Sequence, residues 1–425
     1  MTSQTAFQQA SAEFRKYLPD LDSPRFTTAK QLDATSYAKF FNDNQAPPWL
    51  YNLTQAWQKL FDEPFKGVTE DGSIIPDLYP IQDEGVQIDT IVSAVEAVLG
   101  KLDAAQREQV SYPIDAHEWR AWSNPEMLLR NFGVRLEEVP EEVARSILSV
   151  LQASFSPEGY EKAIAAMEVN HFLGEICSIP RIMNRYSYNF LVFGQPSTTQ
   201  AWGWSLYGHH LCLNVFLKGT QMIIAPTFTG AEPNVIDDGP KMGTSILARE
   251  GELGLRLMQN LPAAEQAKAQ TFKLLHDPGM AQTGDLTTDR WNKDDQRHLC
   301  GAFRDNRVVP YEGVVVAAMD AAQRQLVLEI AEQFLLYLPR TARHLRLDLI
   351  AAHFDQTWFS WIGGYGSHDA FYFRLQSPVI ILEFDHHSGV FLTNTEPAKF
   401  HTHTIVRMPN GGDYGNALRD EGQRL

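Results

Sequence analysis

The chain has 425 residues, 44% of them hydrophobic and 21% charged, as expected for a globular protein with a large core. Its formal net charge of −16 argues against nucleic-acid and anionic-membrane partners, because both bind clusters of lysine and arginine. No stretch approaches about 18 consecutive apolar residues, and the N-terminal segment lacks the apolar region of a secretory signal. We therefore expect a cytoplasmic protein with no membrane partner.

The cysteines and the common catalytic motifs narrow the chemistry further. Cys177, Cys212 and Cys300 are odd in number and far apart, which excludes a disulfide framework and a CxxC zinc site. The sequence has no glycine-rich phosphate loop and no GxSxG motif, so nucleotide-dependent and serine-hydrolase mechanisms are not expected. Any metal would need histidine and carboxylate ligands, and the partner that fits an acidic globular chain is a small-molecule substrate.

Residues 1–111 are expected to form a helical and partly irregular N-terminal cap. Residues 89–99 have the apolar spacing of a helix that ends at Gly100, and a second helix is expected over residues 102–110. Prolines between these helices and the N-terminus predict loops. The cap shows no pattern that indicates chemistry, and residues 112–425 are expected to form an α+β domain that carries the site.

Residues 112–132 contain a polar and aromatic cluster. Its members are His117, Glu118, Trp119, Arg120 and Trp122. One interpretation is the entry to a helix that is capped at Ser123 or Asn124 and has Pro125 at its first position. The other is a pocket wall in which Arg120 binds a substrate carboxylate.

Two helices are expected over residues 140–155 and 156–176, and from residue 186 the apolar period changes to two. Four strands of an antiparallel meander are expected, with turns that contain glycine. In the third strand, His210 and Asn214 lie opposite the apolar face, and His209 lies at the mouth of the strand. We assign Asn214 and the aromatic Trp204 to a substrate cavity. The alternative is that the histidines bond only to neighbouring carbonyl groups.

Helices are expected again over residues 245–260, 262–275, 320–337 and 341–354. The connection from residue 276 to residue 306 is rich in Gly, Asp and Thr, which indicates either a lid or simple surface. A second β block follows. It resembles the first block loosely, which suggests an internal duplication, although tryptophans and glycine turns also recur by chance in meanders.

The second β block ends in two runs that are rich in ionisable residues. The run over residues 378–384 is typical of a buried strand, and at its end lie Glu383, Asp385, His386 and His387. In the run that follows, His401, His403 and Arg407 share one face, because side chains alternate along a strand. Two imidazoles at this spacing can bind one ion.

The motifs WGWSLYGHHLCLN, FRDNRVVPYEGV, EFDHHSGVF and FHTHTIVRMPNGGDYG resemble a family catalogued as domain of unknown function 3500. The resemblance runs from about His117 to Tyr414. It implies a shared fold and shared polar clusters, and the chemistry has to be argued from the residues.

The sequence predicts a divalent metal site on an α+β fold, in which a helical N-terminal part packs on a largely antiparallel sheet or open barrel. The expected ligands lie in three short segments at strand ends: His209, His210, His386, His387, His401 and His403. Such ligands suit Fe, Zn, Cu or Mn. The alternative is a set of hydrogen-bonded core histidines around Glu383 and Asp385.

Three reaction classes remain open. An oxidase or oxygenase with a mononuclear metal is preferred, because three histidines leave coordination positions free in an aromatic pocket. A zinc hydrolase or lyase would use Glu383 or Asp385 as general base. The third class is a non-catalytic binding protein. We expect a carboxylate-bearing substrate that is bound by Arg407 and Arg120. The alternative for Arg407 is an ion pair with Asp413. The sequence does not indicate an oligomeric state.

Overall fold

The computed structural model describes residues 13–45, 47–280 and 298–425. The α-helices in this part of the chain are α2 (Pro24–Ala29), α3 (Ala34–Asn44), α4 (Pro48–Asp62), α5 (Ile88–Lys101), α6 (Ala104–Val110), α7 (Glu141–Ser154), α8 (Pro157–Ile176), α9 (Ala248–Asn260), α10 (Ala263–Ala269), α11 (Ala321–Phe334) and α12 (Arg340–Ala352). The short 3-10 helices are η1 (Arg15–Tyr17), η2 (His117–Arg120), η3 (Val316–Ala318), η4 (Phe354–Gln356), η5 (Asp413–Leu418) and η6 (Glu421–Gln423). None of the helices among the described residues is long and apolar enough to cross a membrane.

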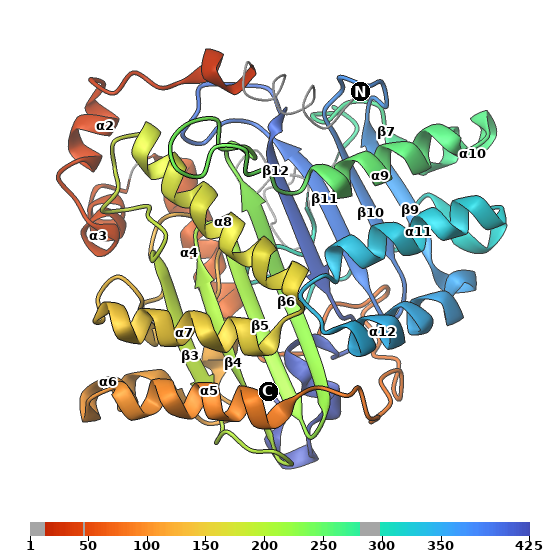
Figure 1. The fold of residues 1–425 in the computed structure, drawn as a ribbon. Coiled ribbons are helices and arrows are strands. Elements are labelled where there is room, and N and C mark those ends of the chain that lie inside the picture. The colour runs from red at the N-terminus through yellow and green to blue at the C-terminus, as the bar shows by residue number, and fades with distance from the viewer. Residues whose placement is uncertain (1–12, 46, 281–297) are drawn as a thin grey trace.

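The strands of the described residues form one large sheet (Figure 1). They are β1 (Ser111–Tyr112), β2 (Val134–Arg135), β3 (Tyr188–Phe193), β4 (Ala201–Gly208), β5 (Leu211–Lys218), β6 (Gln221–Ala231), β7 (Gln270–Phe272), β8 (Val314–Val315), β9 (Trp358–Gly363), β10 (Phe371–Gln376), β11 (Ile381–His387) and β12 (Ala398–Arg407). The order is β1-β3-β4-β5-β6-β12-β11-β10-β9-β7. Except for β1 and β7, which pair in parallel, the strands pair antiparallel. The fold is therefore α+β, with an open sheet.

The sheet consists of two copies of one arrangement. In chain order, each copy contains two helices, two short strands, two more helices and a four-stranded meander. The first short strand pairs in parallel with the first strand of the meander, and the second short strand pairs antiparallel with the same strand. The copies meet where β6 pairs antiparallel with β12. Gly133 and Gly313 are equivalent: both have positive φ, and a Cβ would lie 2.2 Å from Phe190 O and 2.0 Å from Phe359 O. This repetition supports the internal duplication suggested by the sequence.

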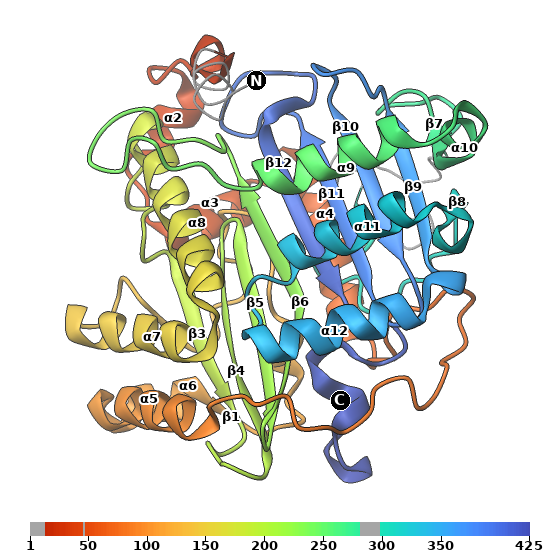
Figure 2. The ribbon, with the colours of Figure 1, turned by 45° about the vertical axis from the view of Figure 1, so that its right-hand side comes forward.

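Helices cover one face of the sheet. Figures 1 and 2 show α5, α7 and α8 over the first copy and α9, α11 and α12 over the second. On this face α9 comes so close that a Cβ at Gly254 would lie 2.2 Å from Phe373 Cε1. The opposite face is covered by irregular segments, by α4 and by the short helices η2 and η5 (Figures 1 and 2). A Cβ at Gly203 would lie 2.6 Å from a ring carbon of Trp119 of η2, and a Cβ at Gly415 of η5 would lie 2.1 Å from Phe216 Cδ1. The candidate site lies on this second face.

The main hydrophobic core draws on both sides of the expected boundary at residue 111. Phe14, Trp57 and Val95 belong to the same buried cluster as Trp204 and Tyr414. The division into a cap of residues 1–111 and a domain of residues 112–425 stays a prediction.

Two local expectations were wrong, and a third was wrong for part of its residues. No helix follows Asn124, where the chain is irregular and the Asn124 carbonyl accepts a hydrogen bond from the His210 N–H. The helix expected over residues 262–275 ends at Ala269, because residues 270–272 pair with β9 instead. Residues 281–297 of the expected lid lie outside the described residues, whereas residues 298–305 are buried and are neither lid nor surface.

Candidate metal centre

Strand register brings the predicted histidines together at the seam between the two copies. His403 lies opposite Asp385 on β11 and opposite Gly230 on β6. His401 lies two residues before His403 and therefore shares its face, as the period-two pattern predicts. A register shift between His386 and His387 interrupts the β11–β12 pairing beside these residues.

The rings of His401 and His403 face each other, with 3.1 Å between their Nε2 atoms. The His401 Nδ1–H donates to the Ser388 carbonyl at 2.8 Å, so the Nε2 of a neutral His401 presents a lone pair. His403 Nδ1 lies 3.2 Å from Asp385 Oδ1, a position that favours the ring proton on Nδ1 and leaves a second lone pair on Nε2. When both rings carry their proton on Nδ1, the two Nε2 lone pairs repel each other unless a cation lies between them, whereas a proton on either Nε2 makes the same contact a hydrogen bond.

The third histidine comes from the β4–β5 hairpin. His210 has a φ of +61°, a left-handed conformation that is uncommon for a residue with a side chain. Its ring centroid lies 5.4 Å from that of His401 and 5.3 Å from that of His403. Its Nδ1 is buried and has no hydrogen-bond partner among the described residues. His210, His401 and His403 each offer a ring nitrogen, and these nitrogens lie within 4.8 Å of one another.

Burial keeps the imidazoles of His210 and His403 neutral. Burial lowers the pKa of His403 from 6.5 to about 4, and burial also lowers the pKa of His210 well below 6.5. A neutral imidazole is the form that binds a metal ion. His210 and His403 are therefore in the protonation state that a metal centre requires.

Two further residues belong to the site and were not predicted from the sequence. His298 is buried, and with Asp385 and His403 it forms a second group of ligand atoms within 4.8 Å of one another. Glu232 Oε1 lies 3.7 Å from His401 Nδ1, and the Glu232 carboxyl group accepts hydrogen bonds from the backbone N–H groups of residues 390, 391 and 392. Burial raises the pKa of Glu232 to about 7.

The other three predicted histidine ligands have different surroundings. The His209 ring stacks on His210 at 3.9 Å, and its Nδ1–H donates to Asn170 Oδ1. The His387 ring stacks on His401 at 4.5 Å, and its Nδ1–H donates to Ser388 O. His386 lies on the helix-covered face, where its Nδ1 accepts a hydrogen bond from the Phe371 N–H. The structure does not bring His386 to the cluster.

The two carboxylates predicted to be catalytic have different partners. Asp385 lies in the cluster, beside His403. Glu383 accepts hydrogen bonds from the Leu299 N–H at 2.6 Å, the Cys300 N–H at 2.8 Å and the Tyr372 hydroxyl at 2.7 Å. Glu383 therefore fixes the segment that carries His298.

A match to a family model covers residues 84–416, which is more than half of the chain, and the family is described as a protein of unknown function, DUF3500. The chain belongs to the DUF3500 family. No curated protein and no solved structure matches it. The region that matches DUF3500 contains both copies of the repeated arrangement and every residue of the candidate centre.

In this DUF3500 chain the two arginines assigned to a substrate carboxylate bond to Asp305 instead. Arg407 donates to Asp305 Oδ1 at 2.7 Å, to Asp413 Oδ2 at 3.1 Å and to the carbonyls of residues 300 and 301. Arg120 donates to Asp305 Oδ2 at 2.8 Å and to two carbonyls near the end of α4. The pairing of Arg407 with Asp413, which the sequence left open as an alternative, is present.

The remaining predicted substrate contacts do not reach the cluster. Asn214 Oδ1 accepts a hydrogen bond from the Ser205 hydroxyl, and its amide donates to the Pro226 carbonyl. Trp204 packs against Phe155 at the end of α7, on the helix-covered face. Neither side chain contacts the histidines.

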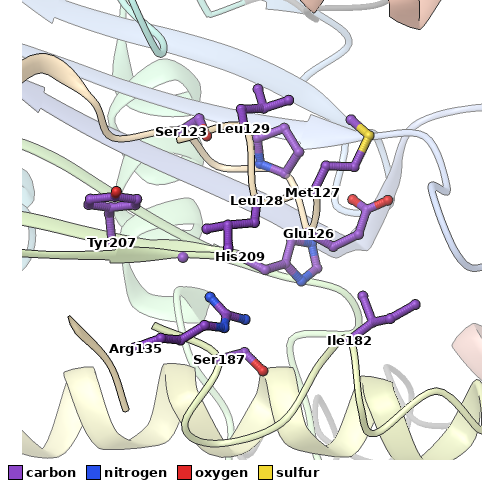
Figure 3. Close-up of a pocket in the computed structure, with 12 residues that line it drawn as sticks. Ser123, Glu126, Met127, Leu128, Leu129, Arg135, Ile182, Ser187, Tyr207 and His209 are labelled. Carbon is purple, nitrogen blue, oxygen red and sulfur yellow. The ribbon is translucent and has the colours of Figure 1, made fainter. Parts of the chain in front are cut away.

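A small pocket lies beside the histidines, and Figure 3 shows the side chains that line it. The lining residues are Ser123, Pro125, Glu126, Met127, Leu128, Leu129, Arg135, Ile182, Ser187, Tyr207, Gly208 and His209. His209 both lines this pocket and stacks on His210. The pocket therefore approaches the candidate centre at His209.

Proposed function

We propose that this DUF3500 protein is a metal-dependent enzyme whose ion is bound by His210, His401 and His403. The observation that carries this proposal is the 3.1 Å approach of the two Nε2 atoms of His401 and His403. Two nitrogen ligands at about 2.0–2.1 Å from a tetrahedral zinc ion lie about 3.3 Å apart, so the observed spacing suits a shared ion. The hydrogen bond from His401 to Ser388 and the carboxylate beside His403 orient both rings, as partners of metal-binding histidines commonly do.

The ligand chemistry suits Fe, Zn, Cu or Mn, and we place oxidase or oxygenase chemistry ahead of hydrolysis. Such an ion would supply redox chemistry or polarise a bound oxygen atom. The buried site next to the Phe228 ring, 5.0 Å from His403, supports a reaction that excludes water. Glu383 already accepts three hydrogen bonds, which weakens its earlier assignment as a general base.

A zinc hydrolase or lyase is the second candidate. The observation that favours it is the position of Asp385, which is buried within the cluster and reaches His403. In that case Asp385 would act as the general base.

We propose a small organic substrate and assign no charge to it. The expectation of a carboxylate group rested on Arg120 and Arg407, and both pair with Asp305. The pocket beside His209 is the candidate route to the ion. A cytoplasmic location is also a proposal, supported by the three buried cysteines, none of which forms a disulfide.

Elemental analysis of protein purified without a histidine tag tests the proposal. Iron or copper at one ion or more per chain supports the oxidative reading, and oxygen uptake with a panel of small organic compounds then tests turnover. Zinc at the same level favours the hydrolytic reading. The proposal would be overturned if the protein contains no metal and takes up none from Zn(II), Fe(II) or Cu(II) solutions. The remaining function would then be that of a non-catalytic binding protein.

A further inference from the structure

His403 lies between two sets of ligand atoms. On one side are His210 and His401, and on the other are His298 and Asp385. The two ring nitrogens of His403 divide between these sets, because Nε2 faces His401 at 3.1 Å and Nδ1 faces Asp385 at 3.2 Å. One imidazole therefore has a nitrogen directed at each set.

His298 has the properties of a metal ligand. Its side chain is buried, yet neither ring nitrogen has a hydrogen-bond partner among the described residues. Leaving a buried polar group unsatisfied destabilises the folded protein, so such a group is expected to have a partner in the functional protein. Its ring centroid lies 5.9 Å from that of His403 and 6.1 Å from that of Phe228.

The backbone that follows His298 is held firmly in place. Glu383 accepts the N–H groups of residues 299 and 300, and Arg407 donates to the carbonyls of residues 300 and 301. Both side chains are buried. These bonds keep the His298 ring near Asp385 and His403, as a preorganised ligand requires.

We propose that His298, Asp385 and His403 form a second divalent-cation subsite, which shares His403 with the first ion. The inference rests on the proposed function and makes the centre dinuclear. Two imidazole nitrogens and a carboxylate oxygen are a donor set that suits Zn, Fe or Mn. When only the first ion is bound, the ring proton of His403 lies on Nδ1, beside Asp385. The second ion replaces this proton, which is released to solvent, and His403 then bridges the two ions as an imidazolate.

Metal stoichiometry tests this proposal. Metal-free wild-type protein is titrated with Zn(II) while bound zinc and released protons are measured. We expect two ions per chain and the release of one proton from His403 with the second ion. One ion per chain overturns the second subsite and leaves the proposed function standing, whereas no bound ion overturns both.

Variants separate the two subsites. We expect His298→Ala to lower the stoichiometry from two ions to one, while His344→Ala, which changes an exposed histidine, keeps two. Two ions bound by a folded His298→Ala protein would contradict the assignment. If His298→Ala does not fold, the wild type is loaded with Cu(II) and measured by electron paramagnetic resonance. Magnetic coupling between two Cu(II) ions supports a shared His403, whereas two uncoupled Cu(II) signals, or the signal of a single ion, contradict it.

Discussion

Gly230 and His403 are direct cross-strand partners, and the absence of a side chain at Gly230 is what allows two histidine rings to approach each other. A Cβ at this position would lie 2.8 Å from Cδ2 of His403 and 2.8 Å from Cδ2 of His210. The small residue thus keeps the space in which the two rings converge from different copies of the repeat.

We predict that Gly230→Ala displaces these rings and weakens metal binding about ten- to a hundredfold, the range expected when the orientation of ligands is disturbed. Calorimetric titration of the metal-free protein measures the effect. Gly100→Ala is the matched control, because an added Cβ there meets no atom within 4 Å and we expect unchanged affinity. Equal metal affinity of Gly230→Ala and the wild type would show that His210 and His403 do not bind the same ion.

Arg407 is predicted to stabilise the fold and not to bind substrate. Arg407→Lys keeps the charge but loses the planar set of donors that joins Asp305, Asp413 and the backbone after His298. We expect a loss of about 3 kcal/mol in the free energy of unfolding, as for other disrupted buried ion pairs. Denaturant unfolding measures it, and the exposed Arg145→Lys serves as control. Unchanged stability of Arg407→Lys, with weaker substrate binding, would restore its earlier assignment.

The pocket residue Glu126 gives a prediction about pH. Burial raises the pKa of Glu126 above 4.5, so the folded protein holds this proton more tightly than the unfolded chain does. The resulting stability is complete below pH 4.5 and is lost as the pH rises through the folded-state pKa. The free energy of unfolding of Glu126→Gln, relative to that of the wild type, should therefore increase as the pH rises above 4.5.

Urea unfolding at several pH values measures this difference for Glu126→Gln. The exposed Glu108→Gln is the control, and its stability relative to the wild type should not depend on pH in this way. If the free energies of unfolding of Glu126→Gln and the wild type differ by the same amount at every pH, the pKa of Glu126 is not raised in the folded protein.

Local patterns in the sequence predicted much of the fold. The change from helical to period-two spacing near residue 186 identified the first meander, and the shared face of His401 and His403 follows from the same alternation. The same alternation places His386 on the face opposite Asp385 and His387, so its separation from the cluster was predictable from the sequence. The order of the strands could not be predicted, because the pairing of β6 with β12 joins segments that are far apart in the chain.

The residues missed at the site have partners that are distant in sequence. Glu232 has no neighbouring histidine to mark it, and its N–H donors lie about 160 positions later, in a loop. His298 lies within the segment whose composition suggested a lid. Its burial depends on Glu383, 85 positions later, and no spacing rule relates the two. Likewise, nothing near Arg407 in the sequence indicates its bond to Asp305.

Metal binding by two neighbouring single variants tests the central claim most directly. His401 and His386 are both buried histidines of adjacent strands, but only His401 faces His403, whereas His386 lies on the helix-covered face. Metal-free wild type, His401→Ala and His386→Ala are titrated with Zn(II), and circular dichroism confirms that each is folded. We predict that His401→Ala loses the ion shared with His403, while His386→Ala binds as the wild type does. Wild-type binding by folded His401→Ala, or equal loss in both variants, would contradict the account.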